Sequence, residues 1–188
     1  MIWSRRRLLK AGGAFAGISA AALWGRSARG QDSTARRDPA NRRIALLNLH
    51  TDERVEVDYF RDGAYVPEAF SAIEVCLRDF RTGGRHAVDP HLMDHLVEVA
   101  RAVGAEPKFS VISGYRSPQT NAMLHERSAG VAQHSLHMDG RAIDVRINGV
   151  DCADLAARAL DLKRGGVGYY RASDFVHLDT GAFRTWKG

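Results

Sequence analysis

Short stretches of strand-like character alternate with longer helical patterns along most of this chain, and this alternation constrains the fold more than any other feature. Hydrophobic periodicity predicts strands at 44–49, 55–60, 108–112, 142–147, 167–170 and 175–179. It predicts helices at 67–80, 89–103, 119–128 and 151–160. Because the order does not follow a strict βαβ period, the sequence favours an α+β fold, a single domain with a central, mainly antiparallel sheet and helices packed around it.

Turn and cap residues mark where several of these elements begin and end. The strands at 44–49 and 55–60 are separated by Thr51-Asp52-Glu53-Arg54, which is typical of a hairpin and places both strands at one edge of the sheet. Asp89 followed by Pro90 is a favourable N-cap and first turn for the helix at 89–103.

Three histidines, His86, His91 and His95, lie close together in the sequence around the start of this helix. His91 and His95 are four residues apart and share one helix face, but no glutamate accompanies them as in a His-Glu-x-x-His zinc motif. The pattern therefore predicts a solvated helix surface and not a pair of metal ligands.

The basic character of the chain is confined to its first 30 residues. The formal net charge is +5, but residues 1–30 contain six basic side chains and no acidic one, which leaves 21 basic and 22 acidic side chains in the rest. A domain with a formal charge of −1 does not fit a nucleic-acid-binding protein, so we expect no nucleic-acid partner.

The first 30 residues are typical of an export signal. Arg5-Arg6-Arg7-Leu8-Leu9 precedes a mildly apolar run at 11–24, which is too short for a stable membrane span. The segment resembles a twin-arginine signal peptide, and small residues favour cleavage near Gln31. We therefore expect a signal at 1–30, a polar linker at 31–43 and one domain at 44–188 that works in the periplasm. An uncleaved membrane tether is the alternative.

The two cysteines, Cys76 and Cys152, would then lie in an oxidising compartment. The sequence leaves open whether they form a disulfide or remain two separate, half-buried thiols, since pairing cannot be deduced from spacing.

Candidate metal ligands occur in the segment 133–145. His137 precedes Asp144 by seven residues, and an imidazole and a carboxylate from one short segment are suitable as two of the three protein ligands of a catalytic zinc. His177 is the candidate for the third, because neighbouring strands can direct Asp144 and His177 to the same face of a sheet. Such a site keeps one open position, where bound water has a pKa of about 7 and amide hydrolysis becomes possible.

Three motifs, in this order along the chain, indicate a known family. They are Ser113-Gly114-Tyr115-Arg116-Ser117, Ser135-x-His137-x-x-Gly140-x-Ala142-x-Asp144 and Phe175-Val176-His177-Leu178-Asp179. Together they resemble the zinc D-Ala-D-Ala metallopeptidase (LAS) superfamily. The run Gly165-Gly166-Val167-Gly168-Tyr169-Tyr170 and the closing Asp179-Thr180-Gly181 are most similar to its murein endopeptidase K group. The resemblance covers nearly all of the chain after the signal.

The resemblance implies zinc as the cofactor, with His137, Asp144 and His177 as ligands. It also implies that Arg116 polarises the scissile carbonyl or stabilises the oxyanion. The general base is less well defined, because the acidic residue of related enzymes falls here at Asp174, an odd offset from His177 that only a bent loop could bring to the metal.

Two other residues are candidates for proton transfer besides Asp174, which is preferred. Asp179 shares the strand face of His177 and could accept the proton or orient the ligand, and His134 is the third candidate. Tyr115, Tyr169, Tyr170 and Trp186 could line a groove for an extended peptide, although aromatic residues on strands are as often part of a core.

The function that the resemblance implies is hydrolysis of peptide cross-links in peptidoglycan by an exported zinc endopeptidase. The alternatives are a D-Ala-D-Ala carboxypeptidase or dipeptidase, and a non-catalytic zinc domain that binds the cell wall. A carboxypeptidase needs a cation for the free carboxylate, and Arg116 is already engaged at the metal, so the sequence favours the endopeptidase. It does not indicate an oligomeric state.

Overall fold

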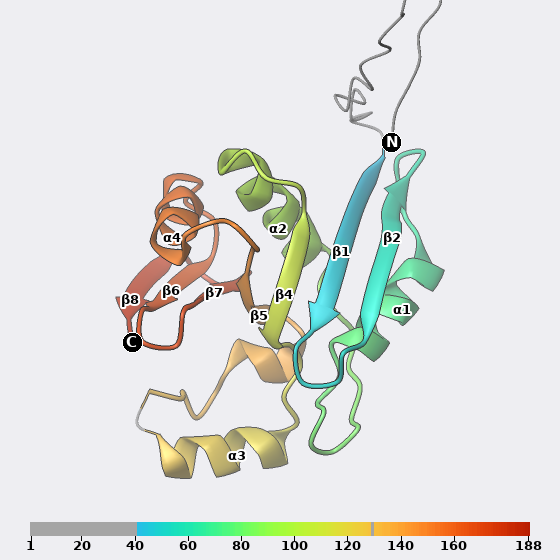
Figure 1. Ribbon diagram of the computed structural model, residues 1–188. Coiled ribbons are helices and arrows are strands. Elements are labelled where there is room, and N and C mark those ends of the chain that lie inside the picture. The colour runs from blue at the N-terminus through green and yellow to red at the C-terminus, as the bar shows by residue number, and fades with distance from the viewer. Residues whose placement is uncertain (1–40, 129) are drawn as a thin grey trace, which may run out of the picture. The chain divides into compact units, whose positions relative to one another are not determined.

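The computed structural model describes residues 41–128 and 130–188, which form one eight-stranded sheet with four α-helices and one 3₁₀ helix (Figure 1). The strands are β1 (Arg42–Asn48), β2 (Arg54–Arg61), β3 (Ala64–Tyr65), β4 (Lys108–Ser113), β5 (Ala142–Arg146), β6 (Gly166–Tyr170), β7 (Phe175–Asp179) and β8 (Arg184–Lys187). The helices are α1 (Pro67–Cys76), α2 (Pro90–Ala102), α3 (Pro118–Arg127) and α4 (Cys152–Asp161), with the 3₁₀ helix η1 at Leu136–Asp139. The expected signal, and the linker as far as residue 40, lie outside the described residues.

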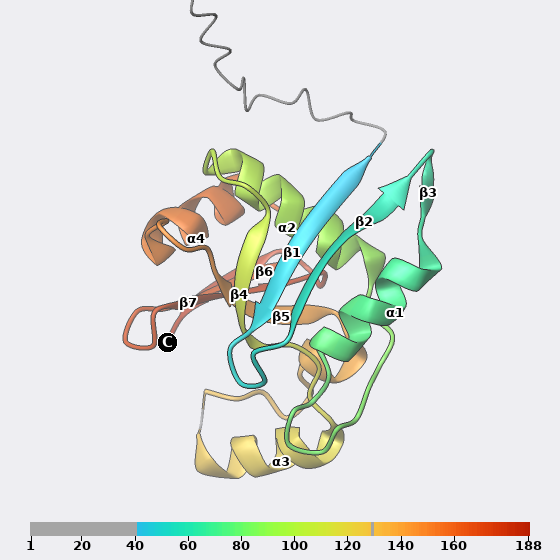
Figure 2. The ribbon, with the colours of Figure 1, turned by 45° about the vertical axis from the view of Figure 1, so that its right-hand side comes forward.

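The strands lie in the order β3-β2-β1-β4-β5-β7-β6-β8. The pairs β1–β4 and β6–β8 are parallel, and the other neighbours are antiparallel. The predicted α+β fold with a mainly antiparallel sheet is therefore confirmed. The predicted hairpin, now β1 and β2, lies at one edge together with the two-residue strand β3, which Figure 2 shows beside α1.

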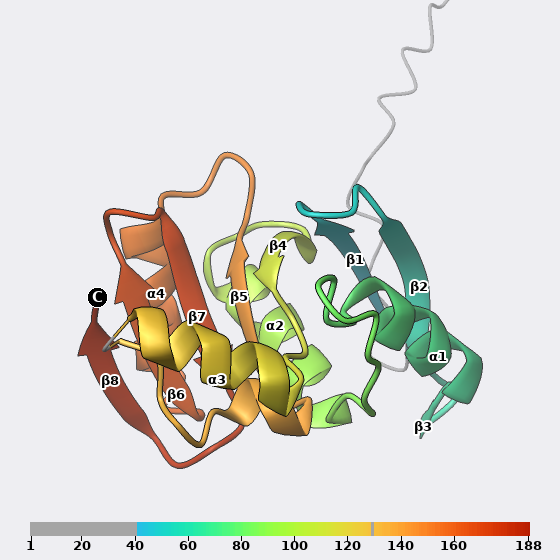
Figure 3. The same cartoon turned by 90° about the horizontal axis from the view of Figure 1, so that it is seen from below.

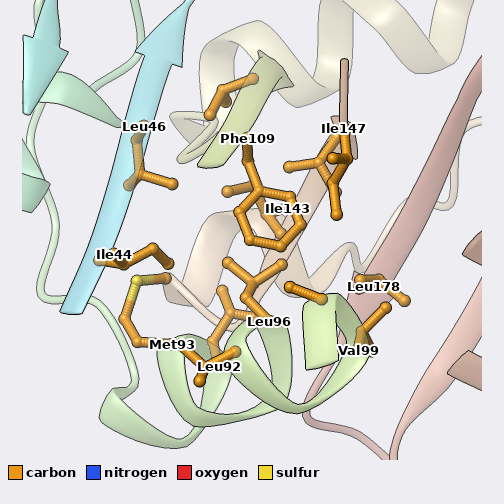
Figure 4. Close-up of a cluster of buried hydrophobic side chains, with 14 of the residues drawn as sticks. Ile44, Leu46, Leu92, Met93, Leu96, Val99, Phe109, Ile143, Ile147 and Leu178 are labelled. Carbon is orange, nitrogen blue, oxygen red and sulfur yellow. The ribbon is translucent and has the colours of Figure 1, made fainter. Parts of the chain in front are cut away.

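The core lies on one face of the sheet. Ile44 and Leu46 of β1 alternate with more exposed residues and point toward α2, where Met93 and Leu96 are fully buried (Figure 4). Leu178 of β7 belongs to the same cluster, so the core extends under both halves of the sheet. Every second residue of β5 and β7 is committed to this core, which leaves the intervening residues for the opposite face.

A buried polar cluster joins α2 to the edge strands. Asp94 accepts hydrogen bonds from the hydroxyls of Tyr59, at 2.9 Å, and Tyr65, at 2.6 Å, and it also pairs with Arg42. Arg42 and Arg43, which fall within the range expected to be a linker, lie in β1.

The helix α1 ends at Cys76, earlier than the expected end near Phe80. The Asn48 side-chain amide donates to the Cys76 carbonyl at 2.8 Å, and the Tyr115 backbone N–H donates to the Leu77 carbonyl, also at 2.8 Å. These long-range bonds use carbonyls that a continuing helix would need. Phe80 stacks instead on His50, with ring centroids 4.0 Å apart.

The prediction of a solvated surface at His91 and His95 is correct for His91 and wrong for His95. His91 is exposed, whereas His95 is only 2% exposed and packs within the buried face of α2. The helix is more deeply covered than its spacing suggested, because α4 also packs against it. Neither histidine joins a metal-binding cluster within the described residues.

The loops and helices that carry the site lie away from the core helices. Figure 1 shows α3 and η1 below the ends of the central strands, and Figure 3 shows α3 crossing those ends when the molecule is viewed from below.

The two cysteines are buried and unpaired, Cys76 in α1 and Cys152 in α4. No helix within 41–128 and 130–188 has the length and apolar character that a membrane crossing requires.

Candidate metal centre

Two strands and one short turn bring the three expected ligands together. Asp144 of β5 and His177 of β7 are directly paired across an antiparallel ladder, so their side chains share one face of the sheet. His137 enters from η1, whose Ser135 cap accepts from the His137 backbone N–H, and whose end at Gly140 has the left-handed φ of 65°. A Cβ at Gly140 would lie 2.0 Å from the Ala87 carbonyl oxygen, so only glycine allows this turn to approach the chain before α2.

The ligand atoms converge at spacings that suit one metal ion. His137 Nε2 is 3.3 Å from Asp144 Oδ1 and 3.2 Å from His177 Nδ1, and His177 Nδ1 is 2.8 Å from Asp144 Oδ1. Tetrahedral zinc with bonds of about 2.0–2.1 Å places its ligand atoms about 3.3 Å apart. The residues therefore fit zinc, and they are the single such group of histidine, cysteine and acidic side chains among the described residues.

The outer nitrogen of each imidazole is held by an acceptor. His137 Nδ1 lies 2.7 Å from the Gly114 carbonyl, and His177 Nε2 lies 3.0 Å from Asp179 Oδ2. Donation to these acceptors directs the lone pairs of His137 Nε2 and His177 Nδ1 toward the shared centre. Gly114, the glycine that follows β4, thus orients the candidate ligand His137 through its backbone carbonyl.

The protonation states of the ligands are set by burial and by their neighbours. Burial lowers the pKa of His137, which favours the neutral imidazole that a metal requires. Burial would raise the pKa of Asp144, but the two imidazoles hold it below its usual range. For His177 burial also acts against the charged form, yet hydrogen bonds to Asp144 and Asp179 raise its pKa.

Arg116 lies beside this cluster, as expected. Its Nη2 donates to Asp144 Oδ2 at 2.6 Å and its Nε donates to Ser113 Oγ at 2.9 Å. The loop that carries it is fixed by Asp79, which accepts from the backbone N–H and the hydroxyl of Ser117 at 3.0 and 2.6 Å. A buried carboxylate from the turn after α1 therefore holds the start of α3 and the position of the guanidinium.

The cluster opens into a pocket of about 340 Å³. One wall comes from residue 128 and from the stretch 130–136, which contributes His134. The opposite wall comes from β6, β7 and β8, with Tyr170, Phe175 and Trp186. Of the four aromatic residues expected at a groove, Tyr170 and Trp186 line the pocket. Tyr169 packs against the core and Tyr115 stacks on His86.

The structure does not bring Asp174 to the other expected site residues. Its side chain is 66% exposed, pairs with Arg146 at 3.3 Å and does not line the pocket. The strand begins after it, as a role at the metal would require, but its left-handed φ of 51° turns the loop toward Arg146. Asp179, by contrast, is fully buried behind His177.

The strand β8 and its Arg184 were not predicted from the sequence. This side chain forms a double ion pair with Asp179, with Nη1–Oδ1 and Nη2–Oδ2 distances of 3.1 and 2.6 Å, and it lines the pocket. The alternation of Arg184 and Trp186 with Thr185 and Lys187 is a weak strand signal, too short to be recognised without its partner β6.

In this α+β domain two imidazoles and one carboxylate surround a single point, beside an open pocket and an arginine. These features are those of a metal-dependent hydrolase. Comparison with known proteins narrows this class. A family model described as "Peptidoglycan L,D-endopeptidase MepK" matches residues 36–186, and the chain belongs to that peptidase family, as its motifs predicted.

Two curated relatives illustrate the similarity. Peptidoglycan L,D-endopeptidase MepK of Escherichia coli K12 is 38% identical over 183 residues, which cover 97% of each chain. Probable peptidoglycan L,D-endopeptidase MepK of Haemophilus influenzae is 37% identical over 186 residues, which cover 98% of this chain and 96% of the relative. No solved structure matched the chain.

Proposed function

We propose that this protein is an exported zinc endopeptidase that hydrolyses peptide cross-links of peptidoglycan. The observation that carries the proposal is the convergence of His137, Asp144 and His177 in an open pocket beside Arg116. The names of the relatives support the same substrate and specify an L,D bond. The corresponding cross-link joins two diaminopimelate residues, from the L-centre carboxyl of one to the D-centre amine of the other.

In this proposal His137 Nε2, Asp144 and His177 Nδ1 hold the zinc. The bound metal would supply a Lewis acid and a water of lowered pKa. Gly114 and Asp179 keep the two imidazoles in the required tautomers, so the ligand set is formed before the metal arrives.

Arg116 is proposed to stabilise the negative charge that develops on the scissile carbonyl oxygen. Its Nε and one Nη2 donor are used by Ser113 and Asp144, and its Nη1 group has no acceptor among the described residues. The guanidinium is therefore held in place and retains donors for the reacting group. Preorganised donors of this kind commonly contribute more to catalysis than any other interaction.

Proton transfer is proposed to involve His134. Asp179 already accepts five hydrogen bonds, from Gly166, Gly181, His177 and both outer nitrogens of Arg184, which fills the capacity of a carboxylate. It therefore suits the orientation of His177 better than proton transfer. His134 is a titratable residue that lines the pocket, and it is not one of the three proposed metal ligands.

Export to the periplasm by the twin-arginine route is part of the proposal. It rests on the arginine-rich start of the sequence and on the substrate, which lies outside the cytoplasm. Twin-arginine substrates cross the membrane folded, which fits a domain that holds its metal between β5, β7 and η1.

The decisive experiment digests defined cross-linked muropeptide dimers with the purified protein and identifies the products by mass spectrometry. We expect about one zinc per chain, conversion of L,D-linked dimers to monomers, and loss of cleavage on chelation. His137→Ala should lose both zinc and cleavage. His91→Ala, which changes an exposed histidine outside the cluster, is the matched control and should retain both.

The products also distinguish the alternatives. Release of a terminal D-Ala from monomers, with dimers left intact, would indicate a carboxypeptidase. Bound zinc without cleavage of any muropeptide would indicate a binding domain. Cleavage that survives His137→Ala would show that the metal centre has been misassigned.

A further inference from the structure

The pocket above the metal cluster has a strong charge imbalance in its lining. Arg116 and Arg184 line it, and the single acidic residue of the lining is Asp144, which is already paired with Arg116. A pocket with this composition attracts a substrate that carries negative charge close to the reacting bond. Arg116 is already paired with Asp144, next to the metal cluster. The position of Arg184 therefore indicates where the negative charge of the substrate would lie.

Arg184 is fixed in place although its side chain is 45% exposed. Its two outer nitrogens bind Asp179, and Nη1 also donates to the Ala182 carbonyl at 3.1 Å. Its guanidinium carbon lies 5.1 Å from the centre of the Trp186 ring, which itself lies 5.1 Å from the His177 ring. These contacts already restrict the side chain. Binding a ligand therefore costs less conformational entropy here than at a mobile surface arginine.

Two of the five N–H donors of Arg184 remain without an acceptor among the described residues. Asp179 takes one donor from each outer nitrogen and Ala182 takes the second donor of Nη1, which leaves the Nε donor and the second Nη2 donor. These two point to the same side of the planar guanidinium and form a fork that matches the two oxygens of a carboxylate.

The fork lies near the ligand cluster. Its guanidinium is separated from the ligand atom His177 Nδ1 by one imidazole ring and one carboxylate, joined by hydrogen bonds of 3.0 and 2.6 Å. The separation between the guanidinium and His177 Nδ1 is therefore about the span of two extended residues, ~7 Å. A group bound at the fork therefore belongs to the residue at the scissile bond or to the next one.

We propose that Arg184 is a specificity-determining residue that binds a free carboxylate of the substrate next to the scissile amide. The inference rests on the proposed function, since it concerns the same pocket. It defines the substrate as an acidic peptide in which the amine of the scissile bond comes from a residue that retains its own carboxylate. A branched diamino acid in a cross-link has this chemistry, and so does the C-terminal residue of a carboxypeptidase substrate, which the muropeptide digestion distinguishes from it. An ordinary internal peptide bond does not.

The test compares two synthetic cross-linked dimers that differ at one group, the carboxylate beside the scissile amide, which is free in one and amidated in the other. The wild-type protein should cleave the free acid with a kcat/KM about tenfold to a hundredfold higher, the effect of a charge-assisted bidentate pair. Arg184→Gln should reduce this ratio to about one. Arg184→Lys, which keeps the charge and loses the fork, should give an intermediate ratio.

A purely structural role for Arg184 predicts a different result. If Arg184 only holds Asp179 behind His177, Arg184→Gln would lower zinc content and the cleavage of both dimers together, and the ratio would stay at the wild-type value. That result, or equal cleavage of the two dimers by the wild-type protein, would overturn the inference and leave the endopeptidase in place. Failure of the wild-type protein to cleave either dimer would instead refute the proposed function.

Discussion

Acidic residues of similar sequence context occupy very different environments at this site. Asp174 and Asp179 lie on either side of His177 in the sequence, and their positions alone did not rank them. Asp179 is buried and accepts from five donors, while Asp174 faces solvent and Arg146. What separates them is the φ angle of one loop residue, which no periodicity encodes.

This difference leads to a prediction for proton transfer. His134→Gln should lower kcat by about 10²–10⁴-fold, the usual contribution of a general acid or base, while zinc content is unchanged. Asp174→Asn should change kcat by less than about threefold, as for other exposed substitutions. Steady-state kinetics and metal analysis of both variants decide the question, and the opposite ranking would return the role to Asp174.

The clustering of the three candidate ligands was predictable at this scale. His137, Asp144 and His177 follow from the residue types, their spacing and the alternation of side chains on paired strands, and the structure brings all three together. The position of Arg184 beside this cluster was not predictable, because it depends on a parallel pairing between β6 and β8 that brings two separate segments side by side.

At the scale of elements, glycines in β6 make room for the wall of the pocket. A Cβ at Gly168 would lie 2.5 Å from the Trp186 ring, so the indole can lie flat on β6 only while residue 168 lacks a side chain. Trp186 also donates to the Tyr170 hydroxyl at 3.0 Å, which joins the two strands at the mouth of the pocket. The glycine-rich run that helped to indicate the family thus has a direct packing role.

Gly168→Ala should therefore displace Trp186 and lower kcat/KM by about tenfold to a hundredfold, because the groups that contact the substrate shift. Trp186 is the single tryptophan of the described residues, so a change in intrinsic fluorescence reports its movement. Gly84→Ala is the control, since the tightest neighbour there, at 3.2 Å, is the end of the Thr82 side chain. Wild-type kinetics and fluorescence in Gly168→Ala would contradict this account.

Element types were largely predictable and some of their limits were not. The caps at Asp89 and Asp151 fixed the starts of α2 and α4, because they act locally. The end of α1 is determined by Asn48 and Tyr115, which are distant in sequence and compete for its last carbonyls. Tertiary contacts of this kind override local periodicity.

At the scale of the whole molecule, His95 couples global stability to pH. Its side chain is 2% exposed and neither ring nitrogen has a hydrogen-bond partner among the described residues. Burial, and after it the charge of Arg164, lower its pKa to about 4 from an unfolded value of 6.5. Between these values the unfolded chain binds a proton that the folded protein excludes, so the free energy of unfolding falls as the pH falls.

The expected loss for the metal-free protein between pH 7 and pH 4 is about 3 kcal/mol from this residue. Denaturant unfolding across this range measures it, and His95→Phe should show a shallower pH dependence even if its stability at pH 7 is lower. An NMR titration of His95 in the wild-type protein checks the cause directly. A folded-state pKa near 6.5 would remove the basis of the prediction.

The order of the site residues along the chain also determines when the metal centre can form during synthesis. The core strand β1 and the helices α1 and α2 precede Arg116, whereas His177, Asp179 and Arg184 are translated after all of them. A nascent chain on the ribosome therefore has most of its core elements before it has a complete ligand set. Under the proposed function, the chain can neither bind zinc at the complete site nor cleave its substrate until β7 and β8 have joined the sheet.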